Sequence, residues 1–366
     1  MFTLIMTSLI LWLVILLLPW HPWGVQETLD AESVVEKRQT QAIDLTILIP
    51  ARNEEDVIKD TLSSLDDQLP DLKIILIDDQ STDETVQRAR ELSLKNLRII
   101  HGKELPEGWS GKLWVLEQGL RETETELILL LDADIKLRPG TLQTLLNKLE
   151  TDNLDFVSLM AQLKMENFWE KLLMPAFIYF FKLLYPFKLS NNGHPLVAAG
   201  AGGCILLKKD GLESIGGFAS LKSALIDDCT LARSFREQGR STWIGLTHSA
   251  ISLRSYDHLS EIWNMVARTA YTQLRYSPLL LLLCTGLMIL AYVVPLIALF
   301  TYPIPAFLII ALILMTYLPT VSYYNLNPLW IAGLPLAGFL YLLMTWTSTF
   351  RYYRGERSQW KGRSYS

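Results

Sequence analysis

Short apolar runs alternate with segments of helical apolar spacing through the middle of the chain. The runs are short enough for strands, and the segments between them show helix-start signals. Because the connections are short, the pattern predicts a mostly parallel, doubly wound α/β sheet. The expected strands are 45–51, 72–77, 97–101 and 126–131, and the expected helices are 54–68, about 81–93, 112–121 and 229–239.

The fourth expected strand ends abruptly in acidic residues. Five consecutive aliphatic residues, 127–131, precede Asp132, Ala133 and Asp134. Strand side chains alternate, so we expect Asp132 and Asp134 on one side and Ala133 on the other. Two carboxylates at the C-terminal end of a buried parallel strand suit a divalent cation. The alternative is a loop that merely leads to a helix at Pro139.

The C-terminal part of the chain is apolar without interruption. Half of all residues are hydrophobic and the mean hydropathy is +0.23, which is high for a soluble enzyme. No charged residue occurs in the 75 positions 276–350. A spanning helix needs about 20 apolar residues, so this run has room for three. The expected spans lie near 278–300, 304–324 and 329–350.

The N-terminus is also apolar. Residues 2–20 lack the basic start and small-residue cleavage site of a signal peptide, and we expect an uncleaved membrane anchor. The expected organisation is an anchor at 1–23, a tether at 24–44, a catalytic domain at 45–277, membrane segments at 278–350 and a basic tail at 351–366. A cytoplasmic domain followed by three spans puts this basic tail outside, against the positive-inside tendency, so one segment is a candidate for re-entry.

Charge and cysteine content exclude other classes. The net charge of −5 and the interspersed signs indicate no nucleic-acid partner. Cys204, Cys229 and Cys284 show neither disulfide-framework nor metal-ligand spacing and are expected to be structural thiols. A G-x-G-x-x-G fingerprint is missing after the first expected strand, which excludes a standard dinucleotide site.

Acidic motifs at three strand ends resemble the glycosyltransferase family 2 catalytic domain, which has the GT-A fold. The resemblance extends over 45–275, and the segment 108–114 and the membrane segments make the bacterial hopene-associated glycosyltransferases the most similar group. The segments that carry it are Ile49-Pro50-Ala51-Arg52-Asn53-Glu54, Ile77-Asp78-Asp79-Gln80-Ser81-Thr82-Asp83, Leu131-Asp132-Ala133-Asp134, Gly200-Ala201-Gly202-Gly203, Ile215-Gly216-Gly217-Phe218 and Ile226-Asp227-Asp228.

The resemblance implies a site for a nucleotide-sugar. Pro50, Ala51 and Glu54 would line the nucleotide pocket and Asp79 would accept a hydrogen bond from the base. Asp132 and Asp134 would hold Mg²⁺ or Mn²⁺ against the diphosphate. These are the residues that the donor half of the site requires.

The same resemblance assigns the remaining roles. Asp228 would be the general base, with Asp227 beside it where the family usually has Glu; the alternative is helix capping by either aspartate. Lys112 would lie near the nucleotide, or it is a solvated lysine at a helix start. Arg275, in Thr272-Gln273-Leu274-Arg275-Tyr276, would contact the diphosphate, or it anchors the chain at the membrane interface.

The expected function follows from these roles. We expect a metal-dependent, inverting, membrane-bound glycosyltransferase that moves a sugar from a nucleotide-sugar to a membrane-associated acceptor, with hopanoid lipids as a candidate. The expected location is the bacterial inner membrane, multi-pass, with a cytoplasmic catalytic domain. An aromatic segment at 168–182 would lie in the membrane interface, or it is a buried core helix. Alternatives are a polyprenyl-phosphate or exopolysaccharide sugar transferase and, as a different class, a non-catalytic membrane scaffold.

Overall fold

The computed structural model describes residues 1–31, 44–69, 72–222, 224, 227–356, 359–360 and 363–364. Asp227 and residues 359–360 and 363–364 are described by their backbone alone. The chain forms two compact units. One contains the α/β sheet and the other contains the apolar helices. The tether predicted at 24–44 lies largely outside the described residues.

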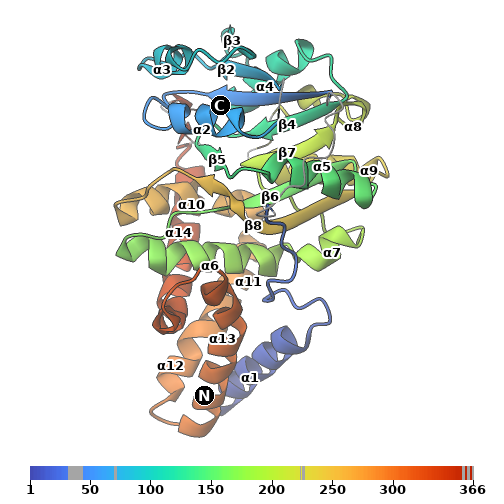
Figure 1. Cartoon of the computed structure of the whole chain (residues 1–366). Helices are drawn as coiled ribbons and strands as arrows, with labels where there is room; N and C mark the ends of the chain where they lie inside the picture. Colours follow the sequence, from blue (N-terminus) through green and yellow to red (C-terminus); the bar gives the residue numbers. More distant parts are fainter. Residues whose placement is uncertain are drawn as a thin grey trace. The chain divides into compact units, whose positions relative to one another are not determined.

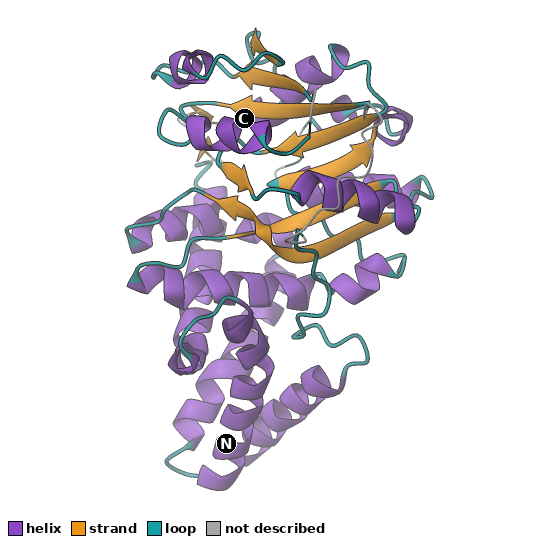
Figure 2. Ribbon diagram, in the orientation of Figure 1, coloured by secondary structure: helices purple, strands orange, loops and turns teal. Residues whose placement is uncertain are grey.

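The α/β unit is built on a mixed sheet (Figures 1 and 2). Its described part has eight strands in the order β3-β2-β1-β4-β7-β6-β8-β5. Strands β3, β2, β1 and β4 are parallel, whereas β7 is antiparallel to both of its neighbours. The strands are β1 (Leu45–Ala51), β2 (Lys73–Asp78), β3 (Leu97–His101), β4 (Leu127–Leu131), β5 (Ile135–Leu137), β6 (Phe156–Gln162), β7 (Cys204–Lys208) and β8 (Thr242–Ser252).

Helices lie on both faces of this sheet (Figure 2). They are α2 (Ile58–Asp66), α3 (Thr85–Glu91), α4 (Gly111–Arg121), α5 (Thr141–Thr151), α8 (Lys209–Ser214) and α9 (Asp227–Glu237). The division of the chain into the two units falls within the short helix α7 (Phe187–Asn191). The four strands predicted from the sequence are confirmed as β1 to β4. The expected helix at 54–68 begins only at Ile58, and the one expected from about 81 begins only at Thr85.

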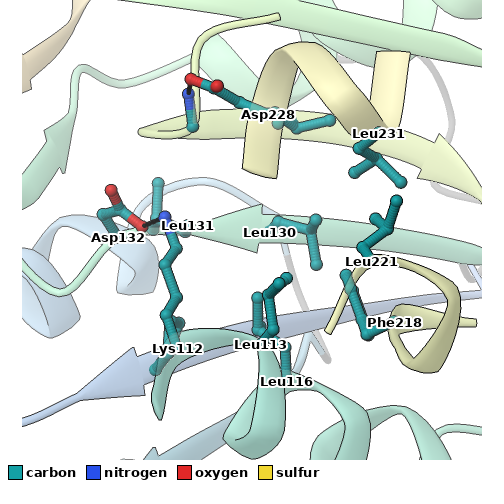
Figure 3. Close-up of a pocket in the computed structure, with 13 residues that line it drawn as sticks. Lys112, Leu113, Leu116, Leu130, Leu131, Asp132, Phe218, Leu221, Asp228 and Leu231 are labelled. Carbon is teal, nitrogen blue, oxygen red and sulfur yellow. Dashed lines mark hydrogen bonds and ion pairs between the residues drawn. The ribbon is translucent and has the colours of Figure 1, made fainter. Parts of the chain in front are cut away.

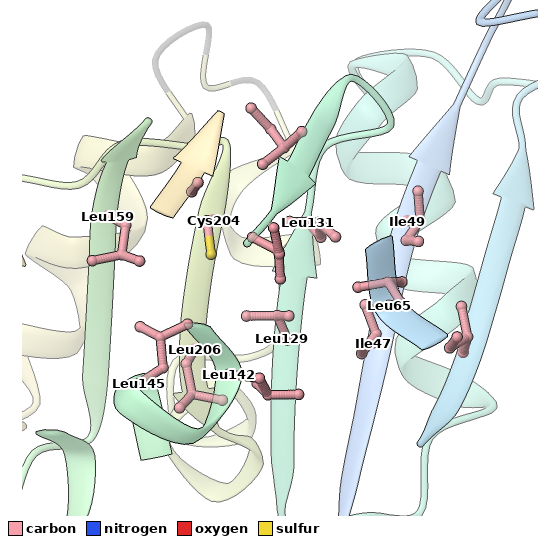
Figure 4. Close-up of a cluster of buried hydrophobic side chains, with 14 of the residues drawn as sticks. Ile47, Ile49, Leu65, Leu129, Leu131, Leu142, Leu145, Leu159, Cys204 and Leu206 are labelled. Atoms are coloured by element: carbon pink, nitrogen blue, oxygen red, sulfur yellow. The ribbon is translucent and has the colours of Figure 1, made fainter. Parts of the chain in front are cut away.

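The alternation of side chains along β4 shows why this strand is apolar throughout. Leu129 and Leu131 pack into one cluster with residues of α2 and α5, such as Leu65 and Leu145 (Figure 4). Ile128 and Leu130, between them, pack into a second cluster with residues of α4 and α9. Both faces of the strand are covered, so an unbroken aliphatic run is required.

The order of the strands determines where a ligand-binding crevice forms. The chain runs outward from β1 to β2 and β3, then returns to the other side of β1 as β4. Such a reversal leaves a crevice beyond the C-terminal ends of the two central strands, where open α/β sheets bind ligands. The prediction of a mostly parallel sheet holds for this half, but β7 and β5 enter antiparallel and the second half is mixed.

The helical unit contains three helices long and apolar enough to cross a membrane, Pro278–Ala298, Pro303–Tyr323 and Pro328–Tyr353. The spans predicted from the sequence are therefore confirmed by length and composition. Several of their apolar side chains, including Leu279, Phe307 and Leu308, are more than half exposed, as expected where lipid is the solvent. The described elements of this unit are α1 (Phe2–Leu17), α6 (Phe168–Leu184), α10 (Leu259–Gln273), α11 (Pro278–Met288), a π-helical turn (Ile289–Val293), α12 (Val294–Ala298), α13 (Pro303–Tyr323), a 3₁₀ segment (Pro328–Gly333) and α14 (Leu334–Tyr353).

The N-terminal apolar helix is shorter than these three. Helix α1 has 16 residues, about 24 Å at the usual rise, against a hydrocarbon core of about 30 Å. Its Trp12 is fully buried and donates a hydrogen bond to the carbonyl of Ala291. Helix α1 thus packs with the apolar helices, and its role as an anchor stays a prediction.

Helix α6 covers the aromatic segment predicted at 168–182. It contains Pro175 and buries a face that includes Tyr179 and Lys182. Tyr179 is within hydrogen-bond distance of Thr316, and Lys182 donates to the carbonyl of Gly24 and to Thr320. This face packs inside the helical unit, as a buried helix does.

A buried glutamate holds the start of α6. Glu170 is 1% exposed, and its carboxylate accepts hydrogen bonds from the backbone N–H groups of Glu166, Asn167 and Tyr256 at 2.9, 3.3 and 2.8 Å. The side chain of Asn167 completes a capping box by accepting from the N–H of Glu170. One side chain therefore joins the first turn of α6 to the segment that precedes α10.

We expect Glu170→Gln to destabilise this unit. The amide keeps the size of the side chain but turns an NH₂ group toward at least one backbone N–H, which leaves a buried donor without an acceptor, at a cost of about 1–3 kcal/mol. Thermal unfolding in detergent should show a lower midpoint than for the wild type. The control is Glu213→Gln, since the Glu213 side chain is 59% exposed and pairs with Lys209 alone among the described contacts. Equal midpoints for the two variants would contradict the role of Glu170.

Candidate functional site

The loops after β1 and β2 are fastened together by their own polar residues. The N–H of Asn53 donates to the Ser81 hydroxyl at 3.0 Å, and the N–H of Thr82 donates to the Asn53 side chain at 2.9 Å. The N–H of Glu54 donates to the Thr85 hydroxyl at 2.7 Å. The polar residues of the two sequence motifs therefore build one rigid edge rather than two separate loops.

This fastening also explains the late start of α3. Asp83 lies one residue before the N-cap Glu84 and accepts hydrogen bonds from both the N–H and the hydroxyl of Thr85, the first residue of α3. Burial raises the pKa of Asp83, but the hydrogen bonds from Thr85 and Glu55 outweigh it and lower the pKa below its ordinary value. Asp83 therefore fixes the first residue of α3 from just outside the helix.

Asp79 lies in the crevice between these loops and is fully buried. Its N–H donates to the carbonyl of Ala51 at 2.7 Å, and its carboxylate is 3.9 Å from the guanidinium of Arg52. Pro50 and Ala51, at the end of β1, are buried beside it. The structure thus brings Pro50, Ala51 and Asp79 together, as the sequence predicts for a nucleotide pocket.

The acids after β4 lie in a turn, which corrects the expectation that they continue the strand. Strand β4 ends at Leu131, and the N–H of Ile135 closes a turn onto the carbonyl of Asp132 at 3.1 Å. Ala133 is buried, and its carbonyl accepts a hydrogen bond from Thr61. The Asp132 and Asp134 side chains are 32% and 17% exposed. Both acids remain accessible because the turn, and not strand alternation, directs Ala133 inward.

Lys112 faces Asp132 across the pocket. Its Nζ is 2.6 Å from Asp132 Oδ1, and Figure 3 shows the lysine reaching from the start of α4. A cation at a helix N-terminus meets the positive end of the helix dipole, so this position is unfavourable without a nearby acid. The pairing places an amine where an anionic ligand can reach it.

Asp228 completes the polar side of the same pocket. Its Oδ2 accepts from the N–H of Gly202 at 2.9 Å, and its Oδ1 accepts from the N–H of Cys229 at 2.7 Å. The hydrogen bond from Gly202 joins the start of α9 to the loop before β7. A residue that only capped α9 would not need this hydrogen bond. The pocket (Figure 3) is lined by Pro50, Lys112, Leu113, Leu116, Leu130, Leu131, Asp132, Gly202, Ile205, Phe218, Leu221, Asp228 and Leu231.

Small residues let the loop at 200–203 pass close to Asp228. A Cβ on Gly200 would lie 2.6 Å from the Asp228 carbonyl oxygen, and one on Gly202 would lie 3.2 Å from Lys112 Nζ. Cys229, next to Asp228, donates its thiol to the carbonyl of Gly200. Gly200 is thus needed for space, whereas a side chain at Gly202 would have to displace the end of Lys112.

Arg254, just after β8, was not predicted from the sequence. Its Nε is 3.3 Å from Asp134 Oδ2, and its second guanidinium nitrogen is 3.8 Å from Glu54 Oε1. The N–H of Leu253 also donates to the Asp134 carbonyl at 2.7 Å. Arg254 therefore links the acid after β1 to the acid after β4.

Two predicted site residues are not placed with the others. Arg275 is exposed beyond the end of α10 and belongs to the helical unit. The backbone of Asp227 begins α9, but its side chain lies outside the described residues. Within the described residues, no group of three or more His, Cys, Asp or Glu is arranged to hold a metal ion.

The cysteines carry no chemistry at this site. Burial and, to a smaller extent, the charge of Asp132 together raise the pKa of the Cys204 thiol to about 12. Cys204, Cys229 and Cys284 are all free thiols. A thiol held in its neutral form is a poor nucleophile, which agrees with the structural role expected from the sequence.

Comparison with known proteins agrees with this geometry. Residues 46–216 match the sequence profile of Glycosyl transferase family 2. This part of the chain, 171 of the 366 residues, is similar to that family. The matched segment covers the loops after β1, β2 and β4 and the loop before β7. It ends before Asp228 and Arg254, which come to the site through the fold.

Curated relatives match over a shorter stretch. A 4,4'-diaponeurosporenoate glycosyltransferase of Staphylococcus aureus (strain USA300) is 36% identical over 105 residues, 28% of each chain. The protein of the same name from Staphylococcus haemolyticus (strain JCSC1435) is 33% identical over 102 residues, 28% of this chain and 26% of the relative. The matched stretch thus spans about a quarter of these relatives.

A solved structure matches over nearly the whole length. Mannosyltransferase PcManGT from Pyrobaculum calidifontis, in complex with GDP-Man and Mn²⁺, is 17% identical, with a TM-score of 0.53 over 92% of this chain and 95% of that one. At this identity the likeness concerns the fold alone. The fold class predicted from the sequence, a GT-A domain with apolar helices, is confirmed.

We expect Gly200→Ala to lower the turnover of this protein by displacing Asp228. The added methyl group would overlap the backbone of Asp228, so the start of α9 must move and the contact between Asp228 and Gly202 must lengthen. The measurement is the rate of nucleoside diphosphate release. The matched control is Gly286→Ala, whose Cβ would meet no atom within 4 Å. Equal rates for both variants would show that the position of Asp228 is unimportant.

Proposed function

We propose that this protein is a membrane-bound, inverting glycosyltransferase that moves a sugar from a nucleotide-sugar to a lipid acceptor. The observation that carries the proposal is the convergence of Lys112, Asp132 and Asp228 on one pocket at the C-terminal edge of β1 and β4. An acid for the proton, an acid for a cation and a fixed amine are the groups that such a transfer needs. A scaffold without activity would need none of these groups.

The donor half of the site would be the crevice at the switch point between β1 and β4. Asp79 would accept a hydrogen bond from the nucleobase between Pro50 and Ala51, and Glu54 would lie beside the ribose and phosphates. Because Asp79 is covered by Arg52 in this structure, the base contact requires that Arg52 move aside. Lys112, within reach of Asp132, would contact the diphosphate. The Pyrobaculum enzyme, which has the same fold, is described in complex with GDP-Man.

The two acids after β4 suit Mg²⁺ or Mn²⁺. Both present carboxylate oxygens from a turn, and each contacts a cationic side chain here, Lys112 for Asp132 and Arg254 for Asp134. Hard divalent cations prefer such ligands, and Mg²⁺ completes its shell with water and substrate phosphates. When bound, the cation would neutralise the charge that develops on the leaving diphosphate. The Mn²⁺ of the Pyrobaculum complex supports this assignment.

Asp228 would act as the general base. The acceptor hydroxyl attacks the anomeric carbon, its proton passes to the Asp228 carboxylate, and the bond from the anomeric carbon to the diphosphate breaks. The N–H groups of Gly202 and Cys229 fix the orientation of this carboxylate. A single displacement of this kind inverts the anomeric centre. Arg275 would contact the diphosphate of the bound donor.

The acceptor would be a membrane lipid. Three helices able to cross a membrane follow the catalytic unit, and the curated relatives are named as glycosyltransferases of 4,4'-diaponeurosporenoate. Hopanoid lipids are our first candidate, and polyprenyl phosphate or an exopolysaccharide is the alternative. With the catalytic unit on the cytoplasmic face of a bacterial inner membrane, a cytoplasmic nucleotide-sugar would reach the donor crevice.

Two linked measurements test this function. The purified protein is incubated with Mn²⁺ and a panel of UDP- and GDP-sugars, with extracted membrane lipids as acceptor, and the products are analysed by mass spectrometry. The lipids of cells with and without the gene are then compared. A glycosylated lipid present in both experiments identifies the acceptor. Release of nucleoside diphosphate that needs no lipid would contradict the proposed lipid acceptor.

We expect Asp134→Ala to abolish metal-dependent turnover and to leave the fold intact, because the residue is accessible and binds charge rather than packing in the core. Turnover is measured over a range of Mn²⁺ concentrations, and circular dichroism reports the fold. Asp152→Ala is the control, an exposed aspartate paired with Lys148. Near-normal turnover of Asp134→Ala would remove the metal assignment.

We expect Asp228→Asn to lower kcat by roughly 10²–10⁴-fold with donor affinity nearly unchanged. The amide keeps the shape of the side chain but cannot take the acceptor proton. If Asp228 were only a helix cap, Asn would replace it well, since the two residues cap about equally. Asp227→Asn should cost less. Full activity of Asp228→Asn would move the base to another residue, with Asp227 first.

A further inference from the structure

The positively charged Arg254 lies between two acids that follow different strands, Glu54 after β1 and Asp134 after β4. The distances to Asp134 and Glu54, 3.3 and 3.8 Å, place one guanidinium against both carboxylates. The side chains of Glu54 and Asp134 are 12% and 17% exposed, and that of Arg254 is 36% exposed. The acids are thus largely shielded from water, while the arginine remains open to it.

Two partly buried carboxylates at one edge repel each other unless a positive charge lies near them. A guanidinium keeps its charge at all physiological pH values and has several donors, so it can hold both acids and can also bind a phosphate. The proposed function assigns Asp134 to the divalent cation and Glu54 to the donor. Arg254 and the metal ion would therefore need the same Asp134 oxygens.

We propose that Arg254 is the counter-cation of the donor-free site and that it competes with the divalent cation for Asp134. Arg254 holds the loops after β1 and β4 in place until the donor arrives. The diphosphate, an anion that the guanidinium can bind, releases Asp134 to the metal ion. This inference rests on the proposed function and adds a residue that positions the metal-binding acid.

The competition has a consequence that can be measured without turnover. Removing the charge of Arg254 should strengthen the binding of the metal alone and weaken the binding of the diphosphate alone. A residue with a merely structural role would weaken both. The opposite signs of the two changes therefore distinguish the proposal from a loss of folding.

The test is a titration of the full-length protein in detergent with Mn²⁺ alone, followed by the electron paramagnetic resonance signal of free Mn²⁺. We expect Arg254→Met to bind Mn²⁺ about tenfold more tightly than the wild type, within the usual range of coupling between two sites. In EDTA, calorimetric titration with GDP and with UDP should show weaker binding of whichever nucleotide the wild type binds. Equal or weaker Mn²⁺ binding by Arg254→Met would overturn the proposal.

A matched control and a conservative variant test whether the change in Mn²⁺ binding comes from the charge of Arg254. Arg240 also contacts two acids, Asp155 and Asp210, so Arg240→Met removes an equivalent cation outside the site and should leave Mn²⁺ binding unchanged. Arg254→Lys keeps the charge and should bind Mn²⁺ more nearly as the wild type does. If Arg254→Met does not fold, Mn²⁺ binding by Arg254→Lys as tight as that expected for the Met variant would overturn the proposal.

Asp134→Ala in the same titration separates the two hypotheses. If it loses Mn²⁺ binding and Arg254→Met binds as the wild type does, the metal assignment stands and the role of Arg254 is wrong. If Asp134→Ala still binds Mn²⁺ fully, Asp134 is not a ligand and both the metal assignment and the competition fail. Loss of binding in the first variant with tighter binding in the second supports both.

Discussion

The reversal of strand order between β1 and β4, which run parallel, is the constraint on which the site depends. Both strands are buried on their two faces, so their own side chains are committed to packing. Polar residues become available only where the strands end, and the reversal leaves the two ends side by side without a helix between them. Glu54 and Asp134, far apart in sequence, therefore meet within reach of one arginine.

The mixed half of the sheet brings the proposed base, Asp228, to the site. Because β7 runs antiparallel to β4, Leu131 pairs with Cys204, and the glycine-rich loop that precedes β7 is brought beside Asp132. The N–H of Asp132 donates to the carbonyl of Gly203 at 3.0 Å. From there Gly202 reaches Asp228. The mixed topology thus delivers the proposed base to the edge that already holds the proposed metal ligands.

Sequence reasoning succeeded where the signal was local. An aliphatic run followed by acids marks a strand end, and β1, β2 and β4 were found in this way. It failed where contacts depend on register between distant segments. Arg254 follows β8, and its partners are set by the pairing of β8 with β5, which places Ile135 opposite Ser252. The turn at Asp132 was also missed, because a strand and a tight turn both leave alternate residues accessible.

The charged side chains at the site carry more negative than positive charge. The acids described at this edge are Glu54, Asp79, Asp132, Asp134 and Asp228, and the cations that contact them are Arg52, Lys112 and Arg254. By formal charge, five acids and three cations leave two negative charges. A diphosphate donor adds further negative charge, so it would be repelled unless positive charge entered with it. In the proposed function a divalent cation would cancel the excess of the acids, and Lys112 and Arg254 could then turn from the carboxylates to the phosphates. The side chains that hold the donor-free site together are then the ones that the donor would require.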